Sequence, residues 1–247
     1  MLLKRKKRTA LRSFRITVLR KRRGESASFR QTFLYAGESE GDTVATALLR
    51  LNARPDLSDI SGERTTPVVW ENSCLQKRCG ACAMLINGEP RLACDTRLRD
   101  LPDEISLAPL RKFPVIEDLL TDRRIMQRNL REIGVYMETE ARPEEKRLFA
   151  LYDASRCLQC GLCLEVCPNY SADSGFTGAA AAVPSARVLL AERQPADSAL
   201  ASAYRKRVFE GCGKSLACEA VCPAGIPVGE MLSRSNAAAV WGRNHGI

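Results

Sequence analysis

Two stretches of the sequence decide its fold: CLQCGLCLEVCP at residues 157–168 and CGKSLACEAVCP at residues 212–223. The first reads C-x2-C-x2-C-x3-C-P, the run by which bacterial two-cluster ferredoxins bind iron–sulfur clusters. The second repeats this spacing, with Ser215 where the second cysteine would stand. The two stretches therefore form an internal repeat, which predicts a pair of clusters held between them.

The repeat also predicts which cysteines share a cluster, because the fourth cysteine of such a run binds the cluster of the other run. One set is then complete for a 4Fe-4S cluster: Cys157, Cys160, Cys163 and Cys222. The other set has three thiolates, from Cys167, Cys212 and Cys218, which suits a 3Fe-4S cluster that lacks the iron facing Ser215. A 4Fe-4S cluster with Ser215 or water on its fourth iron, or plain buried cysteines, are the alternatives.

A third set of cysteines lies earlier in the chain, at Cys74, Cys79, Cys82 and Cys94. Its spacing, C-x4-C-x2-C followed by a later cysteine, is that of plant-type ferredoxins and predicts a 2Fe-2S cluster. Gly80 and Ala81 keep the loop small, so backbone N–H groups can approach the cluster. The alternative is a four-cysteine zinc site, but zinc ribbons usually have paired C-x2-C knuckles, and only Cys79 and Cys82 have that form.

The three sets use all eleven cysteines of the chain. An odd number excludes complete disulfide pairing within one chain, and Arg12, Arg15 and Arg20 interrupt any apolar stretch that could serve as a secretory leader. We therefore expect a reducing compartment. The longest strongly apolar run, residues 178–183, is far shorter than the roughly 20 residues of a membrane span.

Composition and charge limit the function classes further. The 247 residues, 45% hydrophobic and 27% charged, predict one or two globular domains. The net charge of +9 arises at one end, because the first 24 residues hold eleven Lys or Arg and no acid, whereas the remainder has 27 basic and 29 acidic residues. Nucleic-acid binding is therefore disfavoured. The basic cluster at residues 4–8 could lie on anionic lipid headgroups or form a disordered leader.

The apolar pattern predicts strands first and helices later. Residues 13–20 and 28–35 alternate as two strands joined by a turn at Gly24, and Asp42 is expected to cap a helix that ends before Pro55. Asn87-Gly88 is typical of a hairpin tip. After Pro114 the spacing becomes helical, which predicts a mostly α domain with a boundary near residue 112. Its helical positions are Val115, Leu119, Met126, Leu130 and Ile133, then residues 146–152, 185–193, 197–210 and 228–241.

With these motifs, the sequence resembles the iron–sulfur subunit of the succinate dehydrogenase and fumarate reductase family. The match runs from about Phe14 to the last predicted helix, with CGACAMLINGEPRLAC at residues 79–94 and all three cysteine sets in the family's order. The resemblance implies an α+β chain: a basic N-terminal leader at 1–12, a plant-type 2Fe-2S ferredoxin-like β-grasp domain at 13–112, and an all-α helical ferredoxin domain at 113–247. The second domain would hold the 4Fe-4S and 3Fe-4S clusters.

The resemblance also implies a function and partners. In this family electrons pass through the three clusters between a flavoprotein subunit, whose FAD interconverts succinate and fumarate, and quinone at membrane anchor subunits, with or without haem. The chain would be an enzyme subunit with no catalytic residue or carboxylate-substrate site of its own, peripheral on the cytoplasmic face of the cell membrane. The alternatives are a soluble fumarate or enoate reductase with a non-quinone donor, such as a thiol cofactor, and a zinc-binding module without redox activity.

Two departures from the family pattern stand out. Lys77 and Arg78 occupy the first C-x4-C loop, where many members have glycine; they could raise the cluster potential, or face solvent or the flavoprotein. Family quinone pockets lie beside the 3Fe-4S cluster, which makes Pro168, Asn169 and Lys214 the candidate quinone-side residues. The tryptophan and histidine of some members are missing, and Lys214 could bind a quinone oxygen, be solvated, or contact an anchor subunit.

Overall fold

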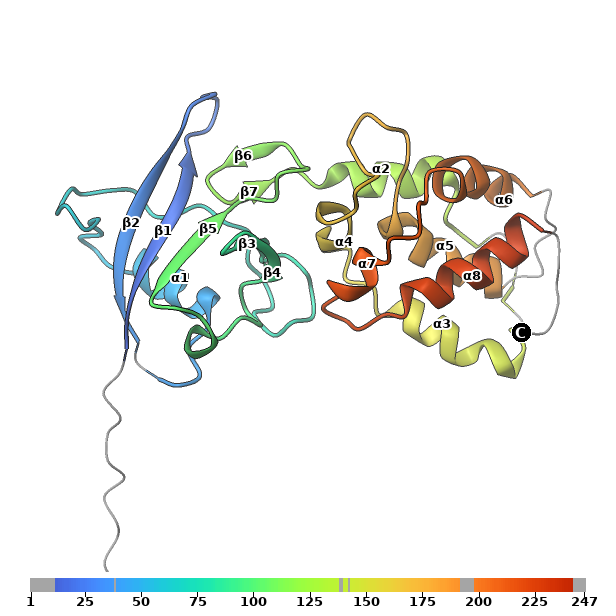
Figure 1. The fold of residues 1–247 in the computed structure, drawn as a ribbon, viewed down its shortest axis with the longest axis horizontal. Helices are drawn as coiled ribbons and strands as arrows, with labels where there is room; N and C mark the ends of the chain where they lie inside the picture. The colour runs from blue at the N-terminus through green and yellow to red at the C-terminus, as the bar shows by residue number, and fades with distance from the viewer. Residues whose placement is uncertain (1–11, 38, 138–139, 142, 192–197, 242–247) are drawn as a thin grey trace, which may run out of the picture.

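The computed structural model of the chain describes residues 12–37, 39–137, 140–141, 143–191 and 198–241. Figure 1 shows a lobe built on a β-sheet beside a lobe built of helices, in chain order. The predicted leader at 1–12 lies almost wholly outside the described residues. Within the described residues, no helix is both long and apolar enough to cross a bilayer.

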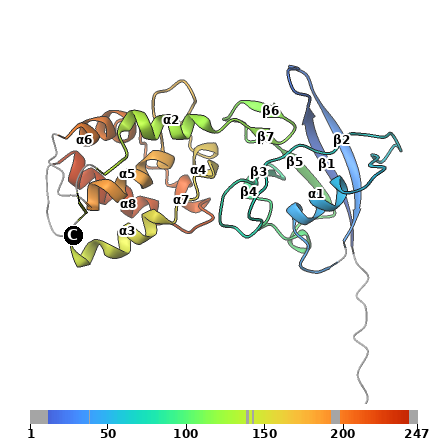
Figure 2. The ribbon, with the colours of Figure 1, turned by 180° about the vertical axis from the view of Figure 1, so that it is seen from behind.

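The first lobe is a five-stranded mixed sheet with the order β2-β1-β5-β3-β4. Its strands are β1 (Ser13–Lys21), β2 (Ser28–Ala36), β3 (Ala83–Ile86), β4 (Glu89–Leu92) and β5 (Glu104–Ala108). Strand β1 is antiparallel to β2 and parallel to β5. Helix α1 (Val44–Asn52) covers one face of the sheet and lies in front of it in Figure 2. A short 3-10 helix, η1 (Leu98–Asp100), precedes β5.

The strand and hairpin signals for this lobe are confirmed. Alternate residues of β1 are buried, because Phe14, Ile16 and Val18 face the core under α1. Asn87 and Gly88 form the two-residue turn between β3 and β4, both with positive φ (52° and 81°). That geometry is the type I′ turn that Asn-Gly favours.

The predicted cap of α1 is wrong by one residue. Thr43 is the N-cap, and its Oγ1 accepts a hydrogen bond from the Thr46 N–H at 3.1 Å. Asp42 is instead buried, where its carboxylate accepts hydrogen bonds from the Tyr35 hydroxyl and from Arg50, both at 2.8 Å. The Asp42 carboxylate therefore belongs to a hydrogen-bond network with side chains of β2 and α1, and the sequence pattern does not predict this network.

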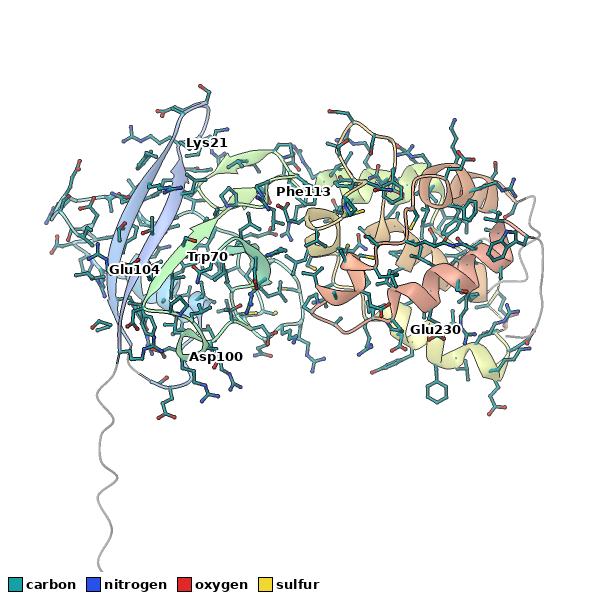
Figure 3. The ribbon with its side chains drawn as sticks, viewed as in Figure 1. Lys21, Trp70, Asp100, Glu104, Phe113 and Glu230 are labelled. Carbon is teal, nitrogen blue, oxygen red and sulfur yellow. The ribbon has the colours of Figure 1, made fainter. Side chains whose placement is uncertain are left out.

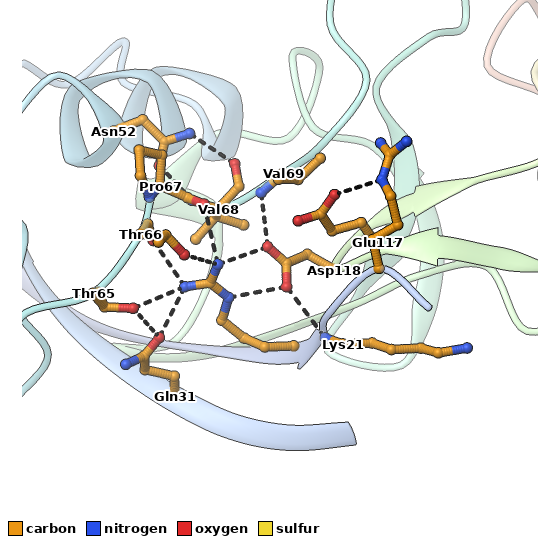
Figure 4. A network of polar contacts seen from close by, with 12 residues as sticks. Lys21, Gln31, Asn52, Thr65, Thr66, Pro67, Val68, Val69, Glu117 and Asp118 are labelled. Atoms are coloured by element: carbon orange, nitrogen blue, oxygen red, sulfur yellow. Dashed lines mark hydrogen bonds and ion pairs between the residues drawn. The ribbon is translucent and has the colours of Figure 1, made fainter. Parts of the chain in front are cut away.

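The helical spacing after Pro114 is also wrong for its first part. Residues there form a hairpin of β6 (Val115–Glu117) and β7 (Leu120–Thr121), with Asp118 at the turn. Asp118 is buried against Arg20 of β1. Arg20 also donates to the side chains of Gln31, Thr65 and Thr66 and to the carbonyls of Thr66 and Pro67, residues that lie around Asp118 in Figure 4. A buried guanidinium needs a counter-charge, and the hairpin at 115–121 places Asp118 where it supplies one. Helix α2 begins only at Arg124 and ends at Ile133.

The second lobe is helical, as predicted. Its elements are η2 (Glu145–Arg147), α3 (Leu148–Ser155), α4 (Leu162–Glu165), α5 (Ala179–Ala191), α6 (Ala199–Tyr204), the π-helix η3 (Arg205–Phe209), α7 (Ala217–Ala220) and α8 (Val228–Ala239). The apolar helix α5 packs against α3, α6 and α8 as the central helix of this lobe (Figure 1). It begins six residues before the predicted start at 185, and it includes Pro184.

The two lobes meet at Phe113, which follows the last strand of the large sheet and lies at their junction in Figure 3. Its ring is 6.5 Å from that of Tyr170, and a methyl group added to Gly161 would come within 3.0 Å of it. The junction is therefore closely packed. The domain boundary near residue 112 stays a prediction.

Candidate cluster-binding sites

The first cysteine set lies in the loop before β3 and at the end of β4. Backbone N–H groups point at its sulfur atoms: Lys77 N lies 3.3 Å from Cys94 Sγ, and Arg78 N lies 3.3 Å from Cys74 Sγ. Left-handed φ angles at Leu75 (55°) and Lys77 (57°) fold the loop around the sulfurs. Gly80 is buried next to them, as a small loop requires.

The four thiols of this set differ in their surroundings. Cys79 is exposed, whereas Cys82 is 3% exposed, and burial raises the pKa of Cys82 to about 12. The N–H groups of Gln76 and Arg78 lower the pKa of Cys74 to about 7. Cys74 also contacts Cys79, and Cys82 contacts Cys94. The four cysteines therefore lie together near the surface. The thiol of Cys82 would be ionised at neutral pH only beside a cation such as iron.

The second set is enclosed. Cys157, Cys160, Cys163 and Cys222 line one cavity together with Cys218 and the first turn of α5. Burial, with a smaller contribution from the neighbouring cysteines, raises the pKa of Cys160 to about 11 and that of Cys163 well above its usual value. Clustered thiols whose pKa values are raised by burial are the donor set that an iron–sulfur cluster fits.

The third set lines the adjacent cavity. Cys167, Cys212 and Cys218 share it with Ser215, so the residue in the place of a fourth cysteine does face the same space. Burial raises the pKa of Cys218, and Cys167 and Cys212 add to the shift. Among the described residues, no three Cys, His, Asp or Glu side chains converge closely enough to hold a single metal ion. The three cysteines line a common cavity instead, and the ligand sets stay a prediction.

The candidate quinone-side residues line this same third cavity. Pro168, Asn169 and Lys214 all border it. The Asn169 amide donates to the Gly211 carbonyl at 2.8 Å, which ties the two halves of the repeat together. Lys214 is exposed, with a left-handed φ of 55°.

One site residue was not predicted. Gln159 donates through Nε2 to the Ala180 carbonyl at 2.9 Å and lies 3.2 Å from Cys157 Sγ. The Ala180 carbonyl is free for this bond because Pro184, four residues on, has no N–H to give it. A proline inside an apolar run beside a cysteine motif is the signal that could have pointed to it.

The comparisons with known proteins agree with this geometry. The family described as "2Fe-2S iron-sulfur cluster binding domain" matches residues 13–128, and that described as "4Fe-4S dicluster domain" matches residues 153–226. The succinate dehydrogenase iron-sulfur subunit of Bacillus subtilis (strain 168) is 34% identical over 207 residues, 78% of this chain and 79% of that protein. The chain belongs to the family of succinate dehydrogenase and fumarate reductase iron–sulfur subunits.

Other family members match as well. The fumarate reductase iron-sulfur subunit of Mycobacterium tuberculosis (strain CDC 1551 / Oshkosh) is 33% identical over 171 residues, 62% of this chain and 67% of that protein. A chain of the structure titled "Mycobacterium smegmatis Sdh1 complex in the apo form" shares the fold, with a TM-score of 0.73 at 22% identity over 96% of this chain and 100% of that one.

Membership in the succinate dehydrogenase and fumarate reductase family settles the coarse function. The chain is an electron-transfer subunit of an oxidoreductase complex with 2Fe-2S and 4Fe-4S cluster domains. The α+β fold and the family resemblance are confirmed. The alternative, a subunit of a soluble fumarate or enoate reductase with a non-quinone donor, is not favoured.

Proposed function

We propose that this chain relays electrons between the FAD of a flavoprotein subunit and quinone at a membrane anchor, through 2Fe-2S, 4Fe-4S and 3Fe-4S clusters in that order. The observation that carries the proposal is the grouping of the eleven cysteines into three sets that follow one another through the molecule. When bound, each cluster would accept and release one electron at a time.

The proposed ligand sets follow the cysteine spacing. Cys74, Cys79, Cys82 and Cys94 hold the 2Fe-2S cluster; Cys157, Cys160, Cys163 and Cys222 hold the 4Fe-4S cluster; Cys167, Cys212 and Cys218 hold the 3Fe-4S cluster. Around them, the chain buries Cys160 of the second set away from water and donates backbone N–H groups to the sulfurs of the first. Both effects tune reduction potentials.

The contacts between the sets support the proposed order of the clusters in the relay. The first set touches the second, because Gly80 packs directly on Cys160. The second and third sets share one wall, since Cys218 lines both cavities. Each set therefore has its neighbour in contact.

The third set marks the proposed quinone end. Pro168, Asn169 and Lys214 would face the quinone, with the exposed ammonium of Lys214 placed to donate to a quinone oxygen. In this proposal the chain sits on the cytoplasmic face of the cell membrane through its anchor subunits, as two domains at 13–112 and 113–247.

The test is purification without oxygen, followed by iron and acid-labile sulfide analysis and EPR. We expect about nine irons per chain, the sum for 2Fe-2S, 4Fe-4S and 3Fe-4S clusters. Absence of acid-labile sulfide would refute the relay as a whole, and about ten irons would refute the three-iron assignment.

A serine-to-cysteine exchange tests the third set separately. Ser215→Cys should convert the three-iron centre to a 4Fe-4S cluster and remove the EPR signal of the oxidised protein. Ser171→Cys, an exposed serine of the same lobe, is the matched control and should leave that signal unchanged. An unchanged signal in Ser215→Cys would contradict the assignment.

A further inference from the structure

The first two cysteine sets meet at a single close backbone contact. A methyl group added to Gly80 would lie 2.7 Å from Cys160 Cβ and 3.0 Å from both Cys160 Cα and the Leu158 carbonyl oxygen. Gly80 also has a φ of +74°, a conformation that glycine adopts without strain. The loop between Cys79 and Cys82 therefore rests on the loop that contains Cys160.

One side chain fastens this contact from the side. Arg123 Nη1 donates to the carbonyl oxygens of Gly80 and Cys160, both at 2.9 Å, and Nη2 donates to the Ala81 carbonyl at 3.1 Å. Two of these acceptors lie between ligands of the first set, and the third belongs to a ligand of the second set. A single guanidinium thus joins both ligand loops.

The surroundings of Arg123 hold it in this position. Its side chain is 12% exposed, and Glu71 pairs with the Nη2 end. Its Cδ lies against Gly161, where a methyl group would approach within 3.6 Å. It stands immediately before α2, as the N-cap residue of that helix. Only the planar, forked guanidinium can serve three acceptors in these directions; an ammonium cannot.

We propose that Arg123 is a positioning residue that fixes the separation of the 2Fe-2S and 4Fe-4S clusters, an inference that rests on the proposed ligand sets. In the step concerned, one electron would pass between the clusters held by the first and second sets, and no bond or proton would move. Electron tunnelling weakens steeply with distance. A clamp on both loops therefore sets the rate of this step.

The test compares Arg123→Gln and Arg123→Lys with the wild-type protein after reduction without oxygen. The readout is the microwave power that half-saturates the 2Fe-2S EPR signal, because a nearby paramagnetic cluster speeds spin relaxation in a strongly distance-dependent way. Arg124→Gln is the matched control, since the neighbouring arginine is 81% exposed and pairs only with Asp122 among the described residues. Iron and sulfide contents are measured for every sample.

We expect both Arg123 variants to keep both clusters but to saturate at lower power, nearer that of an isolated 2Fe-2S cluster. Electron transfer between the two clusters should slow by roughly 10-fold. Arg124→Gln should match the wild type. Gly80→Ala should force the two ligand loops apart by a steric clash with Cys160, so it should also lower the saturation power. This variant tests the dependence on loop separation if Arg123→Gln fails to bind both clusters.

Wild-type saturation in the Arg123 variants, or full rescue by lysine, would overturn the inference while leaving the relay intact. A wild-type protein that lacks either cluster would overturn the relay and this inference together.

Discussion

At the scale of single residues, the ion pair between Arg20 and Asp118 has the largest expected effect on stability. Arg20 binds both oxygens of Asp118, at 3.0 and 2.7 Å, and the two side chains are 5% and 3% exposed. Asp118→Asn should therefore lower the free energy of unfolding by about 3–5 kcal/mol, because the buried guanidinium would lose its counter-charge. Denaturant unfolding of the cluster-loaded protein measures it.

The exposed pair of Arg64 with Asp56 supplies the control for that measurement. Their side chains are 79% and 72% exposed, so Asp56→Asn should change stability by no more than about 0.5 kcal/mol. Equal effects of the two substitutions would show that burial is not what gives the Arg20 pair its strength.

Arg78 allows a test of the charge beside the first cluster. It is exposed, and no ion pair of it is found among the described residues, whereas Lys77 pairs with Asp95 at 2.7 Å. Arg78→Gln should lower the 2Fe-2S reduction potential, since the cation favours the more negative reduced state. A charge in water contributes about 1 kcal/mol or less at 4 Å, on the order of 40 mV or less for one electron.

Redox titration followed by EPR measures that shift. Lys77→Gln is the comparison and should have a smaller effect, because Asp95 already offsets the lysine charge. A rise in potential on removal of the Arg78 charge would contradict the electrostatic explanation.

Single residues also show what the sequence could and could not predict. The cysteines were readable because metal chemistry fixes their spacing. Asp42 was not, because its role depends on Tyr35 and Arg50, which only the fold brings near it. Arg123 carried no motif at all, since its acceptors are backbone carbonyls that any residue would supply.

At the scale of elements, the start of α2 makes a pH-dependent prediction. Asp122 accepts hydrogen bonds from the N–H and the Nε of Arg124, both at 2.9 Å, and these lower its pKa from 3.8 to about 2. A depressed pKa stabilises the fold above 3.8, and the gain is lost as the pH falls toward 2. Asp122→Asn should therefore cost about 0.5–1 kcal/mol at neutral pH.

That difference should stay constant between about pH 8 and about pH 5, because the carboxylate remains charged throughout this range. Thermal unfolding at several pH values measures it, with the exposed Asp100→Asn as control. A difference that shrinks between pH 7 and pH 5 would contradict the lowered pKa.

Strands and hairpins were predictable where one face of the element is buried and the residues of the turn favour one backbone conformation. Strands β1 and β2 and the Asn87-Gly88 hairpin satisfy both conditions. The hairpin of β6 and β7 does not, because its conformation depends on a partner, Arg20, far away in the sequence. Helix α5 begins before its predicted start. The sequence pattern missed its first turns because the alanines before Pro184 are all buried and show no alternation of apolar and polar residues.

At the scale of the whole molecule, a second contact joins the lobes beside Phe113. The Glu165 carboxylate, 1% exposed, accepts hydrogen bonds from Arg111 Nε at 3.2 Å and from Lys112 N at 3.1 Å. Glu165→Gln should lower the free energy of unfolding by about 1.5–3 kcal/mol, since bonds to a charged acceptor are lost.

Denaturant unfolding checks this value, with Glu104→Gln, whose side chain is 84% exposed, as the control. Limited proteolysis provides a second readout, because a loosened junction should be cut faster around residues 111–113. Unchanged stability and unchanged cleavage would show that the Glu165 contact does not hold the lobes together.

The two-lobed plan was predictable from the change of pattern along the chain, strands first and helices later. The way the lobes join was not. It depends on a few pairings across the junction, such as Glu165 with Arg111 and Gly80 with Cys160, and none of them has a periodic signature.

The cysteines of the first set lie within one short segment of the sequence, whereas those of the second set are spread over residues 157–222. This difference has a consequence for biosynthesis. Residues 74–94 and the sheet around them emerge early from the ribosome, so this domain can receive iron and sulfide while translation continues. In the proposed ligand sets, the second site is complete only after Cys222 has been synthesised and has folded back to Cys157. The first set can therefore be completed before the second, whose assembly must await the synthesis of Cys222.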